Sequence, residues 1–288
     1  MNQVFLKRVV ISESILSELK ADVLRQTVRK AYAEVAEADT SGDCCGEASS
    51  CCGVSDDEQI NAIISSRLGY TQDDRDAVPD GADMGLGCGN PRAIASLKAG
   101  ETVLDLGSGG GFDAFLAAQE VGETGHVIGI DMTPTMISKA RANAEQANYL
   151  QVEFRLGEIE HLPVADGSVD VIISNCVINL SPDKSQVFRE MFRVLKTGGR
   201  LAISDVVATT ELPESMRNDP YLHSACVGGA ATIESLEKIM QQAGFISIII
   251  QPKDESREFI RDWVPGSKVE DYVVSATIEG IKGTSIYS

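Results

Sequence analysis

Short apolar segments alternate with helical segments between residues 101 and 206, and this alternation constrains the fold more than any other feature. The apolar segments read as strands: ETVLDLG, GHVIGID, VEFRLG, VDVIISN and GGRLAISDV. The segments PTMISKARANAEQA and SPDKSQVFREMFRVLK, after the second and fourth strands, read as helices. Strands that alternate with helices build βαβ units, whose crossovers are right-handed, so we expect an α/β fold with a mostly parallel sheet.

The segments on either side of this core are also predicted. Residues 12–38 carry apolar residues at near-helical spacing and predict a long amphipathic helix: Ile15, Leu19, Val23, Val28 and Ala31. The Gly- and Ser-rich stretch 39–53 predicts a loop, and Ser55 with Glu58 predicts a capping box for a second helix. Residues 70–90 read as irregular. Beyond residue 210 we expect helices around 221–226 and at 232–243, and strands near 245–251 and 269–278.

Composition excludes several classes of protein. The formal net charge is −18, and an acidic surface repels nucleic-acid phosphates, so a nucleic-acid partner is not expected. No apolar run reaches the roughly 20 residues that span a bilayer, and the N-terminus does not read as a signal peptide. We therefore expect a cytoplasmic protein with no membrane partner. The seven cysteines, an odd number without an export signal, indicate metal ligands, redox groups or core residues rather than a disulfide framework.

A glycine-rich loop follows the first predicted strand. In the sequence Asp105-Leu-Gly107-Ser108-Gly109-Gly-Gly111, glycines let the backbone turn tightly and approach a ligand closely. Asp131 ends the second strand, where a carboxylate can bind a ribose diol. The loop has no basic residue, which favours a cofactor without a pyrophosphate over a dinucleotide. A glycine-bearing turn with no ligand is the simpler alternative.

Three cysteines are placed where they can meet beyond the strand ends. Cys176 follows the fourth strand, at the end of the sheet where ligands bind in this class of fold. Cys88 lies in GLGCGNP and Cys226 in SACVGGA, both beside glycines and without the C-x-x-C spacing of a zinc finger. Thiolates favour soft centres, and trivalent arsenic forms three bonds to sulfur. The simpler alternative for Cys176 is a small core residue.

The order of motifs across residues 100–205 resembles that of class I methyltransferases. Further segments closely resemble the arsenite methyltransferases over residues 55–280: GLGCGNP, VLDLGSGGGFD, GHVIGIDMT, SNCVINLSPDK, VFREMFRVLKTGG and CVGGA. This resemblance implies a Rossmann-like, seven-stranded, mostly parallel sheet flanked by helices, with a helical N-terminal extension. It also implies methylation of As(III) with S-adenosylmethionine, giving mono- and dimethylated arsenicals in detoxification.

The resemblance also implies roles for individual residues. In such enzymes the residue matching Asp131 binds the ribose, and the residue matching Met132 packs on the adenine. The residues matching Gly107 and Gly109 let the backbone pass close to the methionine moiety. Glu158 and Ile159 would edge the adenine, and the remaining positions of the expected cofactor site are Asp105, Ser108 and Asn175. Cys88, Cys176 and Cys226 would hold As(III).

Some consequences of the resemblance concern redox chemistry and domains. An N-terminal cysteine would form a disulfide with Cys88, and four compete for that role: Cys44, Cys45, Cys51 and Cys52. The alternatives for these four are a site for a second metalloid ion and an accessory tail. The extension would span 1–54, and the methyltransferase domain 55–288, with arsenite-binding insertions at about 205–245.

The expected partners are arsenite or its thiol conjugates, and thioredoxin or glutathione as the reductant. Antimonite and selenite stay open as further ligands. We also expect electropositive groups near the cysteines, lowering their pKa values. Two other functions stay open: a class I methyltransferase acting on another small metabolite, and a protein that only sequesters a metalloid through its thiols.

Overall fold

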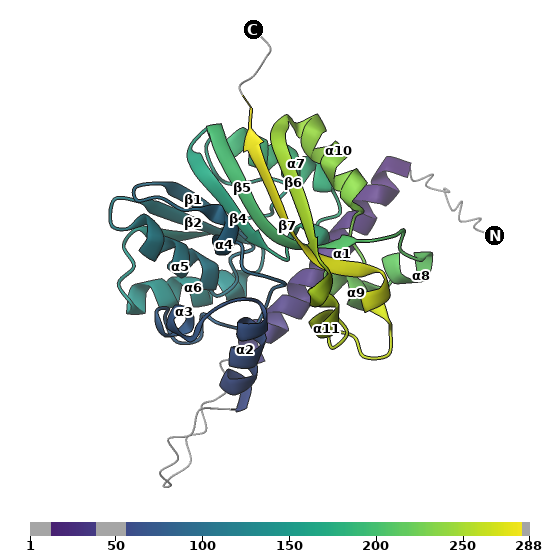
Figure 1. The fold of residues 1–288 in the computed structure, drawn as a ribbon, viewed down its shortest axis with the longest axis horizontal. Coiled ribbons are helices and arrows are strands. Elements are labelled where there is room, and N and C mark those ends of the chain that lie inside the picture. The colour runs from purple at the N-terminus through teal and green to yellow at the C-terminus, as the bar shows by residue number, and fades with distance from the viewer. Residues whose placement is uncertain (1–12, 39–55, 284–288) are drawn as a thin grey trace, which may run out of the picture.

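A seven-stranded sheet forms the centre of the molecule in the computed structural model, which describes residues 13–38 and 56–283. Its strand order is β3-β2-β1-β4-β5-β7-β6 (Figure 1). The strands are β1 (Thr102–Leu106), β2 (His126–Asp131), β3 (Val152–Leu156), β4 (Val169–Asn175), β5 (Leu195–Ala208), β6 (Phe245–Lys253) and β7 (Val273–Lys282). Strands β1 to β5 pair in parallel, whereas β7 is antiparallel to β5 and β6. The predicted fold class is confirmed.

Helices cover both faces of the sheet. Alternate side chains of β1 point to opposite faces, as a strand requires. Leu104 and Leu106 pack in one core cluster with residues of α7 (Lys184–Val194) and α10 (Ile233–Ala243). Val103 packs in the other with residues of α4 (Arg92–Ala95), α5 (Phe112–Val121) and α6 (Pro134–Gln146). Three layers result, and the loops at the carboxyl ends of the strands stay free to build a site.

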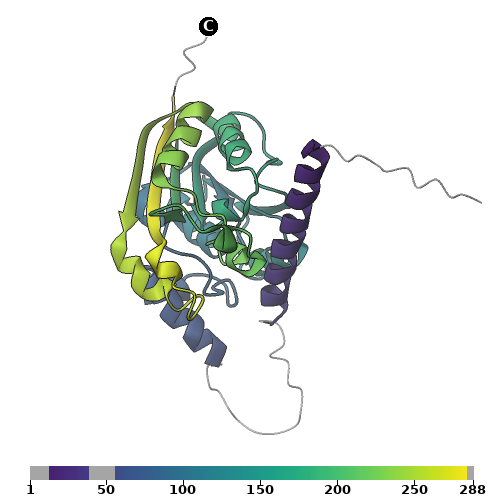
Figure 2. The ribbon, with the colours of Figure 1, turned by 90° about the vertical axis from the view of Figure 1, so that its right-hand side faces the viewer.

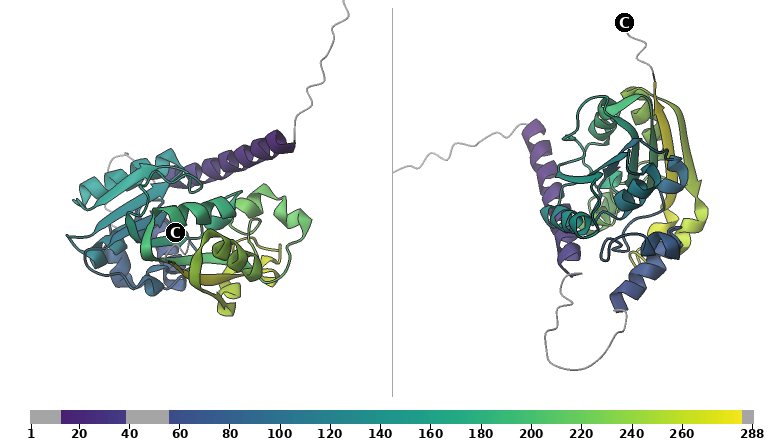
Figure 3. Two further views of the ribbon diagram at one scale, coloured as in Figure 1. Left: turned by 90° about the horizontal axis from the view of Figure 1, so that it is seen from above. Right: turned by 90° about the vertical axis from the view of Figure 1, so that its left-hand side faces the viewer.

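The N-terminal part begins with α1 (Glu13–Ala38), which confirms the predicted long helix. It lies beside the methyltransferase-like core and packs against α6 and α9 (Pro220–Ser224) (Figures 2 and 3). The second helix, α2 (Asp56–Arg67), begins where predicted, although the side chains of the expected capping box lie outside the described part of the chain. Cys44, Cys45, Cys51 and Cys52 also lie outside it. The stretch 70–90 is irregular apart from α3 (Gln72–Asp76).

The C-terminal part differs from the sequence prediction mainly in the position of the last strand. The last strand was expected from residue 269, but Val269–Asp271 form a 3-10 turn (η3) and β7 begins at Val273. The physical reason is the backbone just before the turn, since Lys268 has φ of 59°, which an extended strand does not permit. The remaining short elements are η1 (Ile178–Leu180), α8 (Glu214–Arg217), η2 (Asp254–Ser256) and α11 (Arg257–Ile260). Among the described helices, none has the length and apolar character needed to cross a membrane.

Candidate active site

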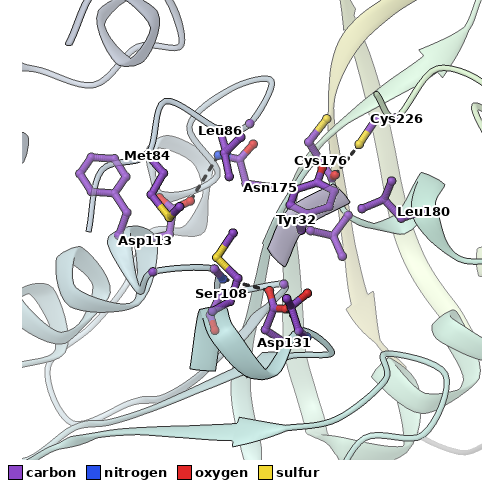
Figure 4. Close-up of a pocket in the computed structure, with 18 of the residues that line it drawn as sticks. Tyr32, Met84, Leu86, Ser108, Asp113, Asp131, Asn175, Cys176, Leu180 and Cys226 are labelled. Carbon is purple, nitrogen blue, oxygen red and sulfur yellow. Dashed lines mark hydrogen bonds between the residues drawn. The ribbon is translucent and has the colours of Figure 1, made fainter. Parts of the chain in front are cut away.

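A cavity of about 470 Å³ lies beyond the carboxyl ends of β1, β2 and β4 (Figure 4). Its lining includes the glycine loop after β1, the segment at the end of β2, and the segments that carry Cys176 and Cys226. Helix α1 contributes Arg25, Val28 and Tyr32, and further residues come from 82–87 and from the segment that carries Trp263. The cofactor and acceptor residues expected from sequence, apart from Glu158 and Cys88, therefore face one common space.

Two glycines of the loop are required for different reasons. Gly107 has φ of 70°, and a Cβ there would lie 2.2 Å from Val177 Cγ2, so packing excludes a side chain. Gly109 has φ of 50°, and a Cβ there would meet no protein atom within 4 Å. Because Gly109 lines the cavity, its missing side chain leaves room for a ligand rather than for the protein.

Two backbone amides hold the carboxylate of Asp131 in place. Its Oδ2 accepts a hydrogen bond of 3.1 Å from the Gly109 amide, and its Oδ1 accepts one of 2.8 Å from the Thr133 amide. Burial raises the pKa of Asp131, whereas these amide hydrogen bonds oppose the rise. The carboxylate is thus oriented at the cavity, and Met132 and Ile159 line the same region.

Two buried polar atoms beside the loop have no protein partner. Asp105 Oδ2 and Ser108 Oγ accept or donate no hydrogen bond among the described residues, although both side chains line the cavity. Burial, followed by the nearby carboxyls of Asp113 and Asp131, raises the pKa of Asp105 well above its usual value. Buried polar groups without a partner are rare, so these two atoms fit a ligand that brings hydrogen-bond donors and positive charge.

Two residues expected at the cofactor have other contacts. The Glu158 side chain does not line the cavity but pairs with Arg29 Nη2 at 3.2 Å and Arg25 Nε at 3.4 Å, both on α1. Asn175 does line it, yet its amide holds the Cys88 segment. Its Oδ1 accepts from the Cys88 amide at 3.0 Å, and its Nδ2 donates to the Gly89 carbonyl at 2.8 Å.

The three cysteines expected at the acceptor lie in one buried cluster. Cys176 and Cys226 line the cavity, whereas Cys88 lies behind them and is 2% exposed. The Cys226 Sγ lies 2.7 Å from the carbonyl oxygen of Cys176. The ligand atoms of Cys88, Cys176 and Asp205 lie within 4.8 Å of one another. Cys226 does not belong to that tighter group, so Cys176 stands between the other two cysteines.

The expectation of lowered thiol pKa values is wrong for two of these residues. Hydrogen bonds with Cys226 and Cys88, together with burial, raise the pKa of Cys176 well above its usual value. Burial raises the pKa of Cys88, and the carboxylate of Asp205 adds to this. The cause is that both thiols are buried, that Cys176 is hydrogen-bonded to the two other thiols, and that Cys88 lies near the carboxylate of Asp205. Both are therefore protonated at neutral pH.

Asp205 and Tyr32 were missed in the sequence. Asp205 accepts hydrogen bonds from the Ile178 amide at 2.9 Å, the Val206 amide at 2.7 Å and Asn179 Nδ2 at 2.9 Å. Burial raises its pKa to about 6. A carboxylate within the apolar strand LAISDVV was the available signal, because charged residues are almost never fully buried without partners. Tyr32 carried no such signal, because the apolar pattern of a helix does not show which residues a tyrosine on it will contact.

Comparison with known proteins adds independent support. A methyltransferase domain family matches residues 97–244. An arsenite methyltransferase of Halobacterium salinarum is 53% identical over 279 residues, covering 94% of this chain and 70% of that protein. The chain belongs to the arsenite methyltransferase family. The family prediction made from the sequence is thereby confirmed.

Other arsenite methyltransferases extend this result. The human arsenite methyltransferase is 45% identical over 154 residues, which cover 50% of this chain and 40% of that protein. The crystal structure of an arsenic(III) S-adenosylmethionine methyltransferase from Chlamydomonas reinhardtii is 33% identical, with a TM-score of 0.56 over 77% of this chain and 73% of that one. This family member therefore shares both sequence and fold with arsenite methyltransferases.

Proposed function

We propose that this protein transfers methyl groups from S-adenosylmethionine to trivalent arsenic, giving mono- and dimethylated arsenicals in detoxification. One observation carries the proposal. Cys176 and Cys226 line the same cavity as the glycine loop and Asp131. A soft-ion site thus adjoins a site with the features of a nucleoside pocket. Membership of the arsenite methyltransferase family supports the same acceptor.

The cofactor half of the cavity fits S-adenosylmethionine. When bound, this cofactor supplies an electrophilic methyl group. Asp131, oriented by two backbone amides, would bind the ribose hydroxyls, while Met132 and Ile159 would pack against the adenine. Asp105 Oδ2 and Ser108 Oγ, which have no partner among the described residues, would suit the charged methionine end, and the open space at Gly109 would leave room for it. Asn175 would act through the Cys88 segment, and Glu158 through α1.

The acceptor half would bind arsenite through Cys88, Cys176 and Cys226. Each exchange joins a sulfur to arsenic, and the thiol proton leaves with the arsenic-bound hydroxyl as water. Protonated thiols suit this balance, since every S–H supplies the proton that its leaving hydroxyl needs. The arsenic lone pair is the nucleophile and carries no proton, so the protein has no base to provide. Its contribution is to position the arsenic and to exclude water.

Repeated methylation requires a reductant. Methylation leaves arsenic formally pentavalent, and two electrons return it to the trivalent state. We propose that Cys88 and one of Cys44, Cys45, Cys51 and Cys52 supply them by forming a disulfide. Thioredoxin or glutathione would then restore the two thiols by exchange. The three described cysteines are free, as a protein of the reducing cytoplasm would require.

The proposed domain boundaries separate an N-terminal extension from the domain that holds the cavity. We propose an extension at 1–54 and a methyltransferase domain at 55–288. Within the latter, the region of about 205–245 brings Cys226 to the cavity through α9 and the turn after it.

Substitution of the cavity cysteines tests the proposal. Cys176→Ser and Cys226→Ser should each reduce arsenite methylation at least about 100-fold, because oxygen is a poor ligand for arsenic compared with sulfur. Binding of S-adenosylmethionine, measured by isothermal titration calorimetry, should stay within about twofold of the unsubstituted protein. Retained turnover in both variants would reject the ligand assignment and favour another small acceptor. Absence of cofactor binding in the unsubstituted protein would favour simple metalloid sequestration.

A further inference from the structure

Helix α1 supplies one complete wall of the cavity. Arg25, Val28 and Tyr32 line it, and their spacing places all three on one face of the helix. None of them lies within residues 97–244, the part matched by the methyltransferase domain family. This wall therefore lies outside the matched domain, and its residues are candidates for a role that is not common to all methyltransferase domains.

Contacts on the neighbouring turns hold this wall against the cofactor half of the cavity. Arg29 Nε donates to the carbonyl oxygen of Met132 at 3.1 Å, and its Nη2 pairs with Glu158 at 3.2 Å. Arg25 Nε lies 3.4 Å from Glu158 and 3.6 Å from the buried Glu160. Ala36, one turn beyond Tyr32, is buried against Met84 and Met136. The backbone on either side of Tyr32 is thus fixed to the body of the protein.

The Tyr32 side chain reaches the acceptor half of the same cavity. Its ring packs with Cys88, Cys176 and Cys226, and Figure 4 shows it beside Cys176. Its hydroxyl lies 3.5 Å from the carbonyl oxygen of Ser224, two residues before Cys226. Burial, then the proximity of Cys226 and Cys176 and a hydrogen bond with Cys226, raise the pKa of Tyr32 well above its usual value. The phenol therefore keeps its proton at neutral pH.

Two hydrogen bonds fix the segment that carries Cys226. The Tyr32 hydroxyl donates to the Ser224 carbonyl, two residues before Cys226. The Cys226 thiol in turn donates to the Cys176 carbonyl. The segment is thus held by α1 on one side and by the Cys176 backbone on the other.

We infer that Tyr32 is a positioning residue of the acceptor site, an inference that rests on the proposed function. Its hydroxyl donates a hydrogen bond to the Ser224 carbonyl, and its ring packs against the cysteine cluster, so that it holds the Cys226 sulfur in the orientation that binds arsenic. Its ring excludes water from the same side. The N-terminal helix is thus part of the arsenic site and not only a cover for the cofactor.

The test compares two tyrosine-to-phenylalanine variants that lose the same atom. Tyr32→Phe removes the proposed donor. Tyr149→Phe is the matched control, because Tyr149 is also partly buried and its hydroxyl donates to the Ala77 carbonyl at 3.2 Å, outside the cavity. The single tryptophan, Trp263, lines the cavity, so its fluorescence reports ligand binding without turnover. Titrations would use sodium arsenite and, separately, S-adenosylmethionine.

Tyr32→Phe should raise the dissociation constant and the KM for arsenite about fivefold, the effect of losing one neutral hydrogen bond. Its affinity for S-adenosylmethionine and its kcat should stay within about twofold, and Tyr149→Phe should leave all of these values unchanged. Unchanged arsenite affinity in Tyr32→Phe would overturn the inference while leaving the proposed function standing. An equal loss of affinity for arsenite and for S-adenosylmethionine would also overturn it, since a residue that only forms a wall of the cavity would affect both ligands. Failure of the unsubstituted protein to bind arsenite would instead reject the proposed function.

Discussion

The Cys226 thiol donates a hydrogen bond of 2.7 Å to the carbonyl oxygen of Cys176, across a separation of 50 residues in the chain. Both cysteines have φ of 60°, the left-handed conformation that few residues other than glycine adopt. Such conformations are unfavourable and persist mainly where the surrounding structure enforces them, often at functional sites. The same two residues line the cavity, so the contact between them orders the acceptor site before any ligand arrives.

This contact predicts an order of stability among variants of Cys226. In Cys226→Ser the hydroxyl can still donate to the Cys176 carbonyl, so the free energy of unfolding should fall by less than about 1 kcal/mol. In Cys226→Ala the carbonyl loses its partner, and unfolding should become easier by about 1–3 kcal/mol. Urea denaturation measures both values. Equal stability of the two variants would mean that the hydrogen bond contributes nothing to the fold.

A methyl group added at Gly109 should act on the ligand and not on the fold. In Gly109→Ala the new Cβ meets no protein atom within 4 Å but enters the cavity. We expect at least about tenfold weaker binding of S-adenosylmethionine, with the backbone penalty limited to about 1–2 kcal/mol. Gly167→Ala is the matched control, because Gly167 has φ of 57°, equally open surroundings and no place in the cavity lining. A similar loss of affinity in both variants would contradict the assignment of the loop to the cofactor.

Replacement of Asp105 by Asn should raise the stability of the fold and weaken ligand binding. Its raised pKa means that the folded state binds the proton more tightly than the unfolded state does. The stabilisation from this proton is present below the unfolded pKa and is lost as the pH rises through the folded pKa. Asp105→Asn, which does not ionise, should therefore be more stable than the unsubstituted protein at pH 7 by at least about 1 kcal/mol.

The advantage of Asp105→Asn should shrink as the pH falls towards about 4, where the carboxyl is protonated in both states. The same variant should bind S-adenosylmethionine about tenfold less tightly, since it loses the carboxylate. Thermal unfolding between pH 4 and pH 8 and calorimetric titration provide the two measurements. A stability difference that does not vary with pH would show that it does not arise from the ionisation of Asp105.

The fold and the cofactor loop could be predicted from sequence because their signals are local. The strand segments around Asp105 and Asp131 are short apolar runs, buried along nearly their whole length. The first is followed by glycine and the second ends in a carboxylate, which a sequence displays directly. Glu158 shows what local signals leave out. The resemblance implied that it edges the adenine, and the structure shows its carboxylate paired with Arg25 and Arg29, more than a hundred residues earlier. Only the packing of α1 brings these charges together.

The sequence alone determined that a parallel α/β sheet would form, that a glycine loop and a carboxylate would lie beyond its first two strands, and that Cys88, Cys176 and Cys226 would stand on loops at that edge. It did so because apolar strand segments and turn chemistry act over a few residues. The tertiary structure decided that Asp205 lies against Cys88 and Cys176, that Asn175 holds the Cys88 segment, and that Tyr32 faces Cys226. These contacts join distant segments, and their protonation states depend on burial, which exists only once the chain has packed.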